Sequence, residues 1–263
     1  MSVRGSNIRT LEKVGRKVGN KALDLLFPEK FEKKPKPASR SQIQRMNVHS
    51  LNQGSGRARG GQLSDERRQR LLAAALTLFA QRGYHGTSVP DVAKAARVAT
   101  GSVYNYFADK NDLVNQVYRA AKQQLKNALL TGLASPNLDD DGGAEAWFAE
   151  LWKRMSAFAL AEPDAFRFLE MQDHVEYLDA ESRTLELSVL GPLFLAGKQL
   201  HDRSGGPPID IAIALLWGAF VGVVKAGRLG YLRIDDKKLA EAGTAAWRLI
   251  APDVTSKRRK KGT

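Results

Sequence analysis

One stretch of eight residues, TGSVYNYF at positions 100–107, has the side chains to make hydrogen bonds with a partner. At helical spacing, one face of this stretch carries the small and polar residues Thr100, Gly101, Tyr104 and Asn105. The opposite face carries Val103 and Phe107, which predicts that it packs into a core. Hydroxyl and amide groups on an exposed helix can bond the base edges or phosphate oxygens of a DNA duplex. The stretch is therefore a candidate for a helix that enters a DNA groove.

Two longer helices and one short helix are expected to position this stretch. Ser88 is a predicted N-cap, Asp91 gives it a carboxylate version of the capping box, and Pro90 fits a first helical turn that needs no N–H donor. The helix before Ser88 is expected to begin at the N-cap Ser64. Its apolar stripe consists of Leu71, Leu72, Ala75, Leu78 and Phe79. The helix after the stretch is expected over 111–130.

Charge is unevenly distributed along the chain. The 263 residues carry a net charge of +13, and residues 1–63 contribute fourteen Lys and Arg against four Asp and Glu. Residues 127–256 are acidic, with twelve basic against nineteen acidic side chains, and the tail Lys257–Lys261 is basic again. Basic ends around an acidic centre indicate a polyanionic partner approached from the N-terminal side. The chain has no cysteine, which excludes disulfides and thiolate chemistry and fits a cytoplasmic protein.

The first 63 residues are expected to be a basic, mostly disordered leader. Prolines interrupt a lysine-rich run, and Gly54–Gly61 has the composition of a flexible linker. Within the leader, Ile8–Phe27 has the pattern of a basic amphipathic helix that could lie on DNA, on an anionic membrane or on a partner. Translation from Met46 is an alternative that would remove this segment. Residues 253–263 are expected to be a basic disordered tail.

The rest of the chain is helical in pattern, so the expected fold class is all-α. The predicted helices after Ala144 include 165–178, 181–200, 209–230 and 236–250. Gly191 and Pro192 predict a kink or break in the helix over 181–200. The loop before these helices is expected at Pro136 and Asp139–Gly143.

The segment 209–230 is the most apolar part of the chain. Four small residues recur there at every fourth position and allow close approach of another helix: Ala214, Gly218, Gly222 and Ala226. A membrane span is a rival interpretation, but the run Ile211–Val224 is shorter than the roughly 20 apolar residues that a bilayer requires. We favour a subunit interface formed by these four residues and Trp247. A helix buried within one subunit is the alternative.

Residues 64–113 resemble the DNA-binding domain of the TetR family of one-component bacterial regulators. The matching positions run without a gap and include Ala75, Leu78, Phe79, Gly83, Tyr84, Thr87, Ser88, Val92, Ala93, Ala96, Val98, Gly101, Tyr104, Tyr106, Phe107, Lys110 and Leu113. The resemblance implies an N-terminal three-helix, helix-turn-helix DNA-binding domain over 64–113. It further implies a helical ligand-binding and dimerisation domain over 114–252, although that part is similar in architecture alone. Two chains would place their recognition helices in successive major grooves of a roughly palindromic operator.

On this sequence the resemblance identifies nine candidate DNA contacts: Ser88, Arg97, Thr100, Gly101, Ser102, Tyr104, Asn105, Tyr106 and Lys110. Arg97 stands where the family commonly has glycine. If the backbone is left-handed there, a side chain costs about 1 kcal/mol, which a phosphate contact by the guanidinium would offset. Lys110 begins the next helix, where its charge adds to the helix dipole in a phosphate site. The basic leader has no counterpart in the family pattern.

The function implied is a transcriptional repressor that a small molecule releases from DNA. The expected pocket is lined by Trp147, Phe148, Trp152, Phe166, Met171, His174 and Tyr177, and it would suit an apolar or aromatic ligand. Each of these residues also fits an ordinary core position. No cofactor, metal ion or membrane span is expected, and the partners are double-stranded DNA, a second copy of the chain and an unknown small-molecule ligand.

Two other functions fit parts of the sequence. A small helical enzyme is disfavoured because the chain has no G-x-S-x-G, P-loop or H-E-x-x-H motif. Glu170, Asp173 and His174 could share a metal ion, but ligands from one helix rarely close a site. A protein that coats DNA through its basic ends is the third possibility, and it predicts steeply salt-dependent binding with little sequence preference.

Overall fold

The computed structural model describes residues 56–136, 142–174, 176–204 and 207–250, and all regular structure in these ranges is helical, which confirms the all-α fold class. The predicted amphipathic segment Ile8–Phe27 and the basic tail lie outside the described residues. The helices are α3 (Gly56–Arg82), α4 (Val89–Ala96), α5 (Thr100–Val103), α6 (Lys110–Leu130), α7 (Gly143–Ala161), α8 (Pro163–Glu170), α9 (Ala180–Ser204), α10 (Ile209–Arg228) and α11 (Asp236–Ile250).

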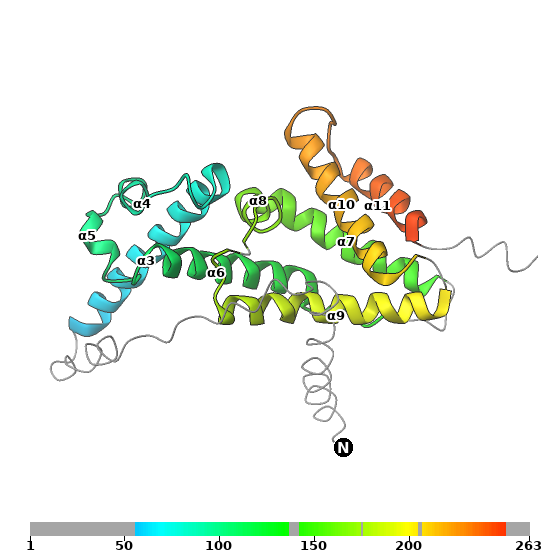
Figure 1. Ribbon diagram of the computed structural model, residues 1–263, viewed down its shortest axis with the longest axis horizontal. Helices are drawn as coiled ribbons and strands as arrows, with labels where there is room; N and C mark the ends of the chain where they lie inside the picture. The colour runs from blue at the N-terminus through cyan, green and yellow to red at the C-terminus, as the bar shows by residue number, and fades with distance from the viewer. Residues whose placement is uncertain (1–55, 137–141, 175, 205–206, 251–263) are drawn as a thin grey trace, which may run out of the picture.

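The helices form two groups at opposite ends of an elongated molecule (Figure 1). We call α3, α4 and α5 the head and α7 to α11 the body. Helix α6 packs on α3 of the head and on α7 and α9 of the body, and α8 packs on α3. At the far end from α5, α10 packs on α11, which also packs on α7. Because α6 is continuous, the predicted boundary between residues 113 and 114 falls inside a helix that serves both groups.

Buried apolar side chains and polar caps explain the local structure of the head. Phe79 of α3 and Val92 of α4 are fully buried in its core. The Ser88 hydroxyl caps α4 by accepting the backbone N–H of Asp91 at 3.2 Å. Asp109 caps α6 by accepting the N–H of Asp112 at 2.8 Å. These caps fix where the two helices on either side of α5 begin.

Helix α3 begins earlier than predicted. It starts at Gly56 instead of following an N-cap at Ser64, so the first eight residues of the helix belong to the predicted leader and linker. The Ser64 hydroxyl points to the Tyr106 hydroxyl, at 3.5 Å, and does not cap the helix. Glycines make this segment a poor helix former, but extending an existing helix is much less costly than nucleating one.

Two helices of the body also differ from expectation. The predicted helix 165–178 is shorter, because α8 ends at Glu170 and a loop leads to α9. The loop carries backbone groups of Tyr177 and Asp179 to the buried amide of Asn115 on α6, which a continuing helix would not allow. Helix α9 is continuous through Pro192, so of the predicted kink or break the break does not occur. Side chains of α9 on both sides of the proline are buried, so packing supports the helix before and after Pro192.

Helix α10 is longer than the apolar run identified in the sequence. It has 20 residues with a mean hydropathy of 1.9, so within the described residues it is the one helix long and apolar enough to cross a membrane. A single helix of this kind is a weak sign of a membrane span. Only Ala212 and Phe220 of α10 are buried, whereas Ile211 and Leu215 are about half exposed. The side of α10 that carries Ile211 and Leu215 is therefore an exposed apolar face, whereas its other side packs on α9 and α11.

Candidate nucleic-acid interface

The recognition segment is shorter as an α-helix than the sequence predicts. Regular α5 ends at Val103, and the chain continues to Phe107 in tighter turns. In these turns the Asn105 N–H bonds the Ser102 carbonyl at 3.3 Å and the Tyr106 N–H bonds the Val103 carbonyl at 3.0 Å. Such i to i+3 bonds are typical of short 3₁₀ segments at helix ends. The segment therefore keeps a helical path while it turns toward α6.

The two faces of this segment differ sharply in exposure. Val103 and Phe107 are each 1% exposed and anchor the segment in the core of the head. The side facing outward carries the exposed residues Thr100, Gly101, Tyr104 and Asn105, with Ser102 half-buried beside them. No atom lies within 4 Å of the position that a Cβ on Gly101 would take, so the backbone there is open to close approach by a partner.

Three of the predicted contacts at the edges of the segment already have partners within the chain. The Ser88 hydroxyl donates to the Asp91 carboxylate at 2.6 Å, so it serves first as a helix cap. Tyr106 is half-buried beside Phe107. The Lys110 ammonium lies 4.1 Å from the centroid of the Tyr84 ring, and partial burial lowers the pKa of Lys110. This contact holds Lys110 next to the recognition segment at the start of α6.

Arg97 has a left-handed backbone, which is the condition under which its side chain costs energy. Its φ of 58° and ψ of 47° end α4, and its N–H caps the helix by bonding the carbonyls of Ala93 and Lys94. Among the described residues it is the one non-glycine residue with positive φ. The Arg97 side chain is exposed. The chain thus keeps a strained arginine at a position where glycine would be relaxed.

Replacing Arg97 with glycine is expected to raise the free energy of unfolding by about 1 kcal/mol, because glycine adopts this backbone without a Cβ clash. If Arg97 neutralises a phosphate, the same change should reduce the slope of log affinity for DNA against log salt by about 1. Urea unfolding and DNA titration at several salt concentrations measure the two effects. Arg97→Ala is the matched control, since it removes the charge and keeps the strain. Equal stability of the two variants would contradict the strain argument.

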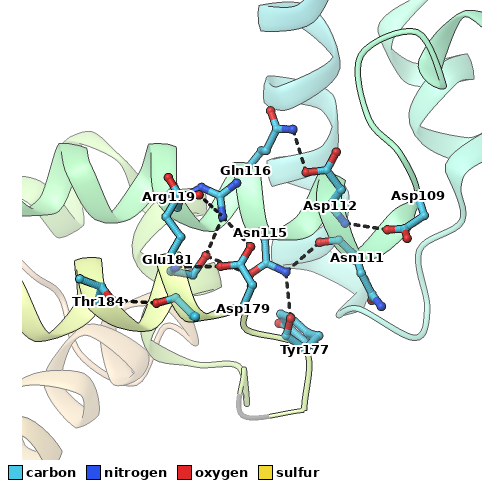
Figure 2. Close-up of polar contacts among 12 residues, drawn as sticks. Asp109, Asn111, Asp112, Asn115, Gln116, Arg119, Tyr177, Asp179, Glu181 and Thr184 are labelled. Atoms are coloured by element: carbon cyan, nitrogen blue, oxygen red, sulfur yellow. Dashed lines mark hydrogen bonds and ion pairs between the residues drawn. The ribbon is translucent and has the colours of Figure 1, made fainter. Parts of the chain in front are cut away.

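A polar cluster joins α6 to the start of α9 and to the loop before it (Figure 2). The Asn115 side chain is buried, and its amide nitrogen donates to the carbonyls of Asn111 and Tyr177, each at 2.8 Å. Its oxygen accepts the Asp179 N–H and the Ser182 hydroxyl, each at 2.9 Å. All four hydrogen bonds of the amide are therefore made, which is what a buried asparagine requires.

Arg119 extends this cluster along α6. Its Nη1 lies 2.7 Å from an oxygen of Asp179 (Figure 2). The same nitrogen lies 3.2 Å from the Ser182 hydroxyl. Partial burial acts to raise the pKa of Asp179, but hydrogen bonds from Ser182 and Arg119 hold it below its ordinary value. The start of α9 is therefore fixed to α6 by a charged as well as a neutral set of bonds.

The predicted pocket residues separate into two packed groups. Phe148, Trp152 and Phe166 belong to the body, where Trp152 and Phe166 pack edge-on against Phe220 with ring centroids 5.0 and 5.6 Å apart. Trp147 is half-buried, and its indole N–H donates to the Ala134 carbonyl at 2.8 Å. Their role as ligand contacts stays a prediction, because the structure shows these side chains packed on protein.

The second group lies where the body meets the head. Tyr177 stacks on Tyr84 with centroids 4.6 Å apart, and the buried His174 packs edge-on against Phe168 at 4.8 Å. Met171 is half-buried in the same loop. Tyr84, which follows α3, joins the head to the body, a contact that its place in the sequence does not predict.

The predicted dimer residues occupy the open side of α10. Ala214, Gly218 and Gly222 are exposed, and Ala226 is half-buried. Nothing lies within 4 Å of a Cβ placed on Gly218 or Gly222. Trp247 differs from them, because its ring packs on Phe148 of its own chain at 5.3 Å. These four small residues line a surface without a covering helix in the described chain.

The head is a three-helix domain with an exposed recognition segment, and comparison with known proteins identifies its class. The sequence pattern of the bacterial regulatory proteins of the tetR family matches residues 71–117. The repressor KstR2 of Rhodococcus jostii is 34% identical over 154 residues, which cover 56% of this chain and 72% of that protein. The regulator HbdR of an Aromatoleum species is 42% identical over 52 residues, and the match spans only 23% of its length. The crystal structure of a TetR family regulator from Marinobacter aquaeolei aligns with 73% of this chain and 99% of its own, with a TM-score of 0.60 and 23% identity.

The chain therefore belongs to the TetR family of transcriptional regulators. It is a DNA-binding regulator and not an enzyme. In place of the metal site considered above, Glu170 faces the ammonium of Lys122 at 3.6 Å, and the His174 ring bonds the Phe168 carbonyl and the Tyr177 hydroxyl.

Proposed function

We propose that this chain is a repressor that binds a palindromic operator as a homodimer and leaves it when a small molecule binds. The observation that carries the proposal is the exposed polar face of residues 100–105 on a segment anchored by Val103 and Phe107. An anchored segment holds its polar groups in a fixed position and orientation relative to the rest of the head. That is what reading base edges in a major groove requires.

Asn105 and Tyr104 are the proposed base readers. An asparagine amide can pair with adenine through two hydrogen bonds, and a tyrosine hydroxyl can bond either a base edge or a phosphate. Both side chains are exposed, and Tyr104 is 55% exposed although it is large and aromatic. Arg97 and Lys110 flank them as proposed phosphate contacts and supply the sequence-independent part of the affinity.

The proposed dimer forms through α10. Its exposed apolar residues Ile211 and Leu215 adjoin the small residues Gly218 and Gly222, so a partner helix can pack closely and bury apolar surface. The head lies at the other end of the molecule (Figure 1). Two chains joined at α10 would therefore present two heads to one duplex, as a palindromic site requires.

Release needs only a change in the distance between the two heads. A ligand that binds one dimer shape more tightly than another shifts the population toward that shape. Helix α6 and the contacts of α8 on α3 carry such a change from the body to the head. We place the protein in the cytoplasm, bound to the nucleoid, because its target is chromosomal DNA.

Replacing Asn105 with alanine is expected to weaken binding to the operator by about 1–3 kcal/mol and to relax base preference at one position in each half-site. Lys110→Ala is the comparison variant, and it should weaken binding to all sequences alike. Binding to every single-base variant of the operator half-site measures both. A uniform loss from Asn105→Ala would show that this residue is no base reader.

The proposal is tested against the DNA-coating alternative by competition. The full chain is bound to a labelled fragment of the promoter next to its own gene in an excess of random DNA, and the number of chains per fragment is measured by light scattering. Retained binding with an even number of chains is expected. Equal loss from the promoter and from unrelated DNA of the same length would favour a coating protein.

A further inference from the structure

A groove of about 830 Å³ opens between α3 of the head, α6, and α9 of the body. Its lining includes Arg68 and Leu72 of α3, Arg119 of α6, and Glu181, Thr184 and Leu185 of α9. The volume is in the range of pockets that hold small organic ligands. The lining shares no residue with the predicted pocket, the predicted dimer surface or the predicted DNA contacts.

Two arginines give the groove hydrogen-bond donors that the protein does not use. Arg68 donates through Nη2 to the Gln116 side chain at 2.5 Å, and Arg119 donates through Nη1 to Asp179 and Ser182. Within the part of the chain that the structure describes, the other N–H groups of these two side chains have no acceptor. The Arg119 side chain is only 19% exposed and is held in place by its carboxylate partner. Free donors on a fixed guanidinium favour an anion that accepts two hydrogen bonds.

Charge and apolar surface define the ligand further. Arg119 lies near two carboxylates, Asp179 at 2.7 Å and Glu181 at 3.5 Å, whereas Arg68 contacts the neutral side chain of Gln116. Arg68 is therefore the positive charge of the groove that has no carboxylate partner among the described residues. One negative charge on a ligand balances this positive charge, whereas a phosphate dianion would leave one excess negative charge next to Glu181. Leu72, which is buried, and the half-buried Leu185 supply apolar walls beside the arginines.

We infer that this groove binds a small organic monoanion, a carboxylate joined to an apolar body, through Arg68 and Arg119. Arg68 already joins α3 to α6, and Arg119 joins α6 to α9. A ligand held by both arginines bridges α3 and α6, and its apolar body reaches Leu185 of α9 in the lining, so it fixes the head against the body. The effect of this ligand on DNA binding rests on the proposed repressor function, whereas the binding of the ligand to the groove does not.

The test uses a single introduced thiol, because the chain has no cysteine. Thr184→Cys places the thiol in the lining of the groove, and Thr244→Cys places one at an exposed position of α11 as the control. The alkylation rate of each full-length variant is measured with octanoate, phenylacetate or the uncharged matches octanol and phenylethanol. The carboxylates are expected to protect position 184 and not position 244, and the alcohols to protect neither.

The role of the arginine is tested in the Thr184→Cys background. Arg68→Gln is expected to weaken the protection by about tenfold in ligand concentration, since it removes a charge-assisted hydrogen bond. Arg67→Gln changes an exposed neighbour outside the groove and should leave protection unchanged. Protection by the alcohols, protection that survives Arg68→Gln, or none from either carboxylate overturns the inference. The assay contains no DNA, so failure of the proposed repressor function would leave its result unaffected.

Discussion

Replacing Lys122 with methionine is expected to lower the free energy of unfolding by about 3–5 kcal/mol, because it leaves a buried carboxylate without its partner. The Lys122 side chain on α6 is 5% exposed. Its ammonium lies 3.6 Å from Glu170 of α8 and 3.7 Å from Glu186 of α9. Glu170 is itself 10% exposed, and burial raises its pKa against the opposing effect of Lys122. Without the ammonium, Glu170 must either hold an uncompensated charge or take up a proton.

A double variant separates the charge from the packing. Lys122→Met with Glu170→Gln removes both members of the buried pair, so it should recover most of the stability lost in the single variant. Lys126→Met, one turn further along α6 and half-buried, is the matched control and should change stability by about 0.5 kcal/mol or less. Urea unfolding at one fixed protein concentration measures all three, because the stability of the proposed dimer would depend on concentration. A double variant no more stable than Lys122→Met would refute the charge argument.

The position of Lys122 predicts that a movement of the body is passed to the head. It lies on the helix that both groups share, and its two carboxylates come from α8 and α9. Asn115 and Arg119 make further contacts from α6 to the start of α9. A ligand that shifts α9 must therefore either move α6 with it or break buried charged contacts. We expect α6, and the head packed on it, to switch between two positions and not to move gradually.

Local patterns were enough to predict most helices and the recognition segment. Helix α11 has the predicted bounds of Asp236–Ile250, and the predicted start of α10 at Ile209 is correct. The faces of 100–107 follow from eight consecutive residues, because Val103 and Phe107 are one helical turn apart. Arg97 shows the same principle, since its left-handed backbone depends on the turn that it occupies.

Contacts between distant residues account for the predictions that differ. The end of α8 depends on Asn115, which binds backbone groups of Tyr177 and Asp179 more than sixty positions further along the chain. The spacing of apolar residues in 165–178 carries no information about that contact. The groove is a similar case, because Arg68 and Arg119 come from different helices and each resembles an ordinary surface charge in the sequence.

Acidification between pH 6.5 and pH 4 is expected to destabilise the protein through His174, by about 2 kcal/mol at pH 5. The side chain is 8% exposed, and burial lowers its pKa to about 4. Its Nε2 lies 2.6 Å from the Phe168 carbonyl and so carries the proton, while Nδ1 accepts from the Tyr177 hydroxyl at 2.5 Å. The unfolded chain binds a proton near pH 6.5 and the folded chain only near pH 4. Stability is therefore full at neutral pH and falls as the pH drops through this interval.

Variants at two histidines identify the source of this pH dependence. His174→Gln should reduce the slope of the free energy of unfolding against pH by the equivalent of up to one bound proton. It should also lower stability at neutral pH, because the ring contacts with Phe168 and Tyr118 are lost. His85→Gln removes an exposed histidine next to Glu176 and should leave the dependence in place. Unfolding by urea at a series of pH values between 7.5 and 4.5 gives the slopes. The same slope in the His174 variant as in the unmodified chain would assign the dependence to other groups. Because Tyr177 also stacks on Tyr84, loss of the neutral His174 contact should loosen the junction between head and body before the rest of the fold.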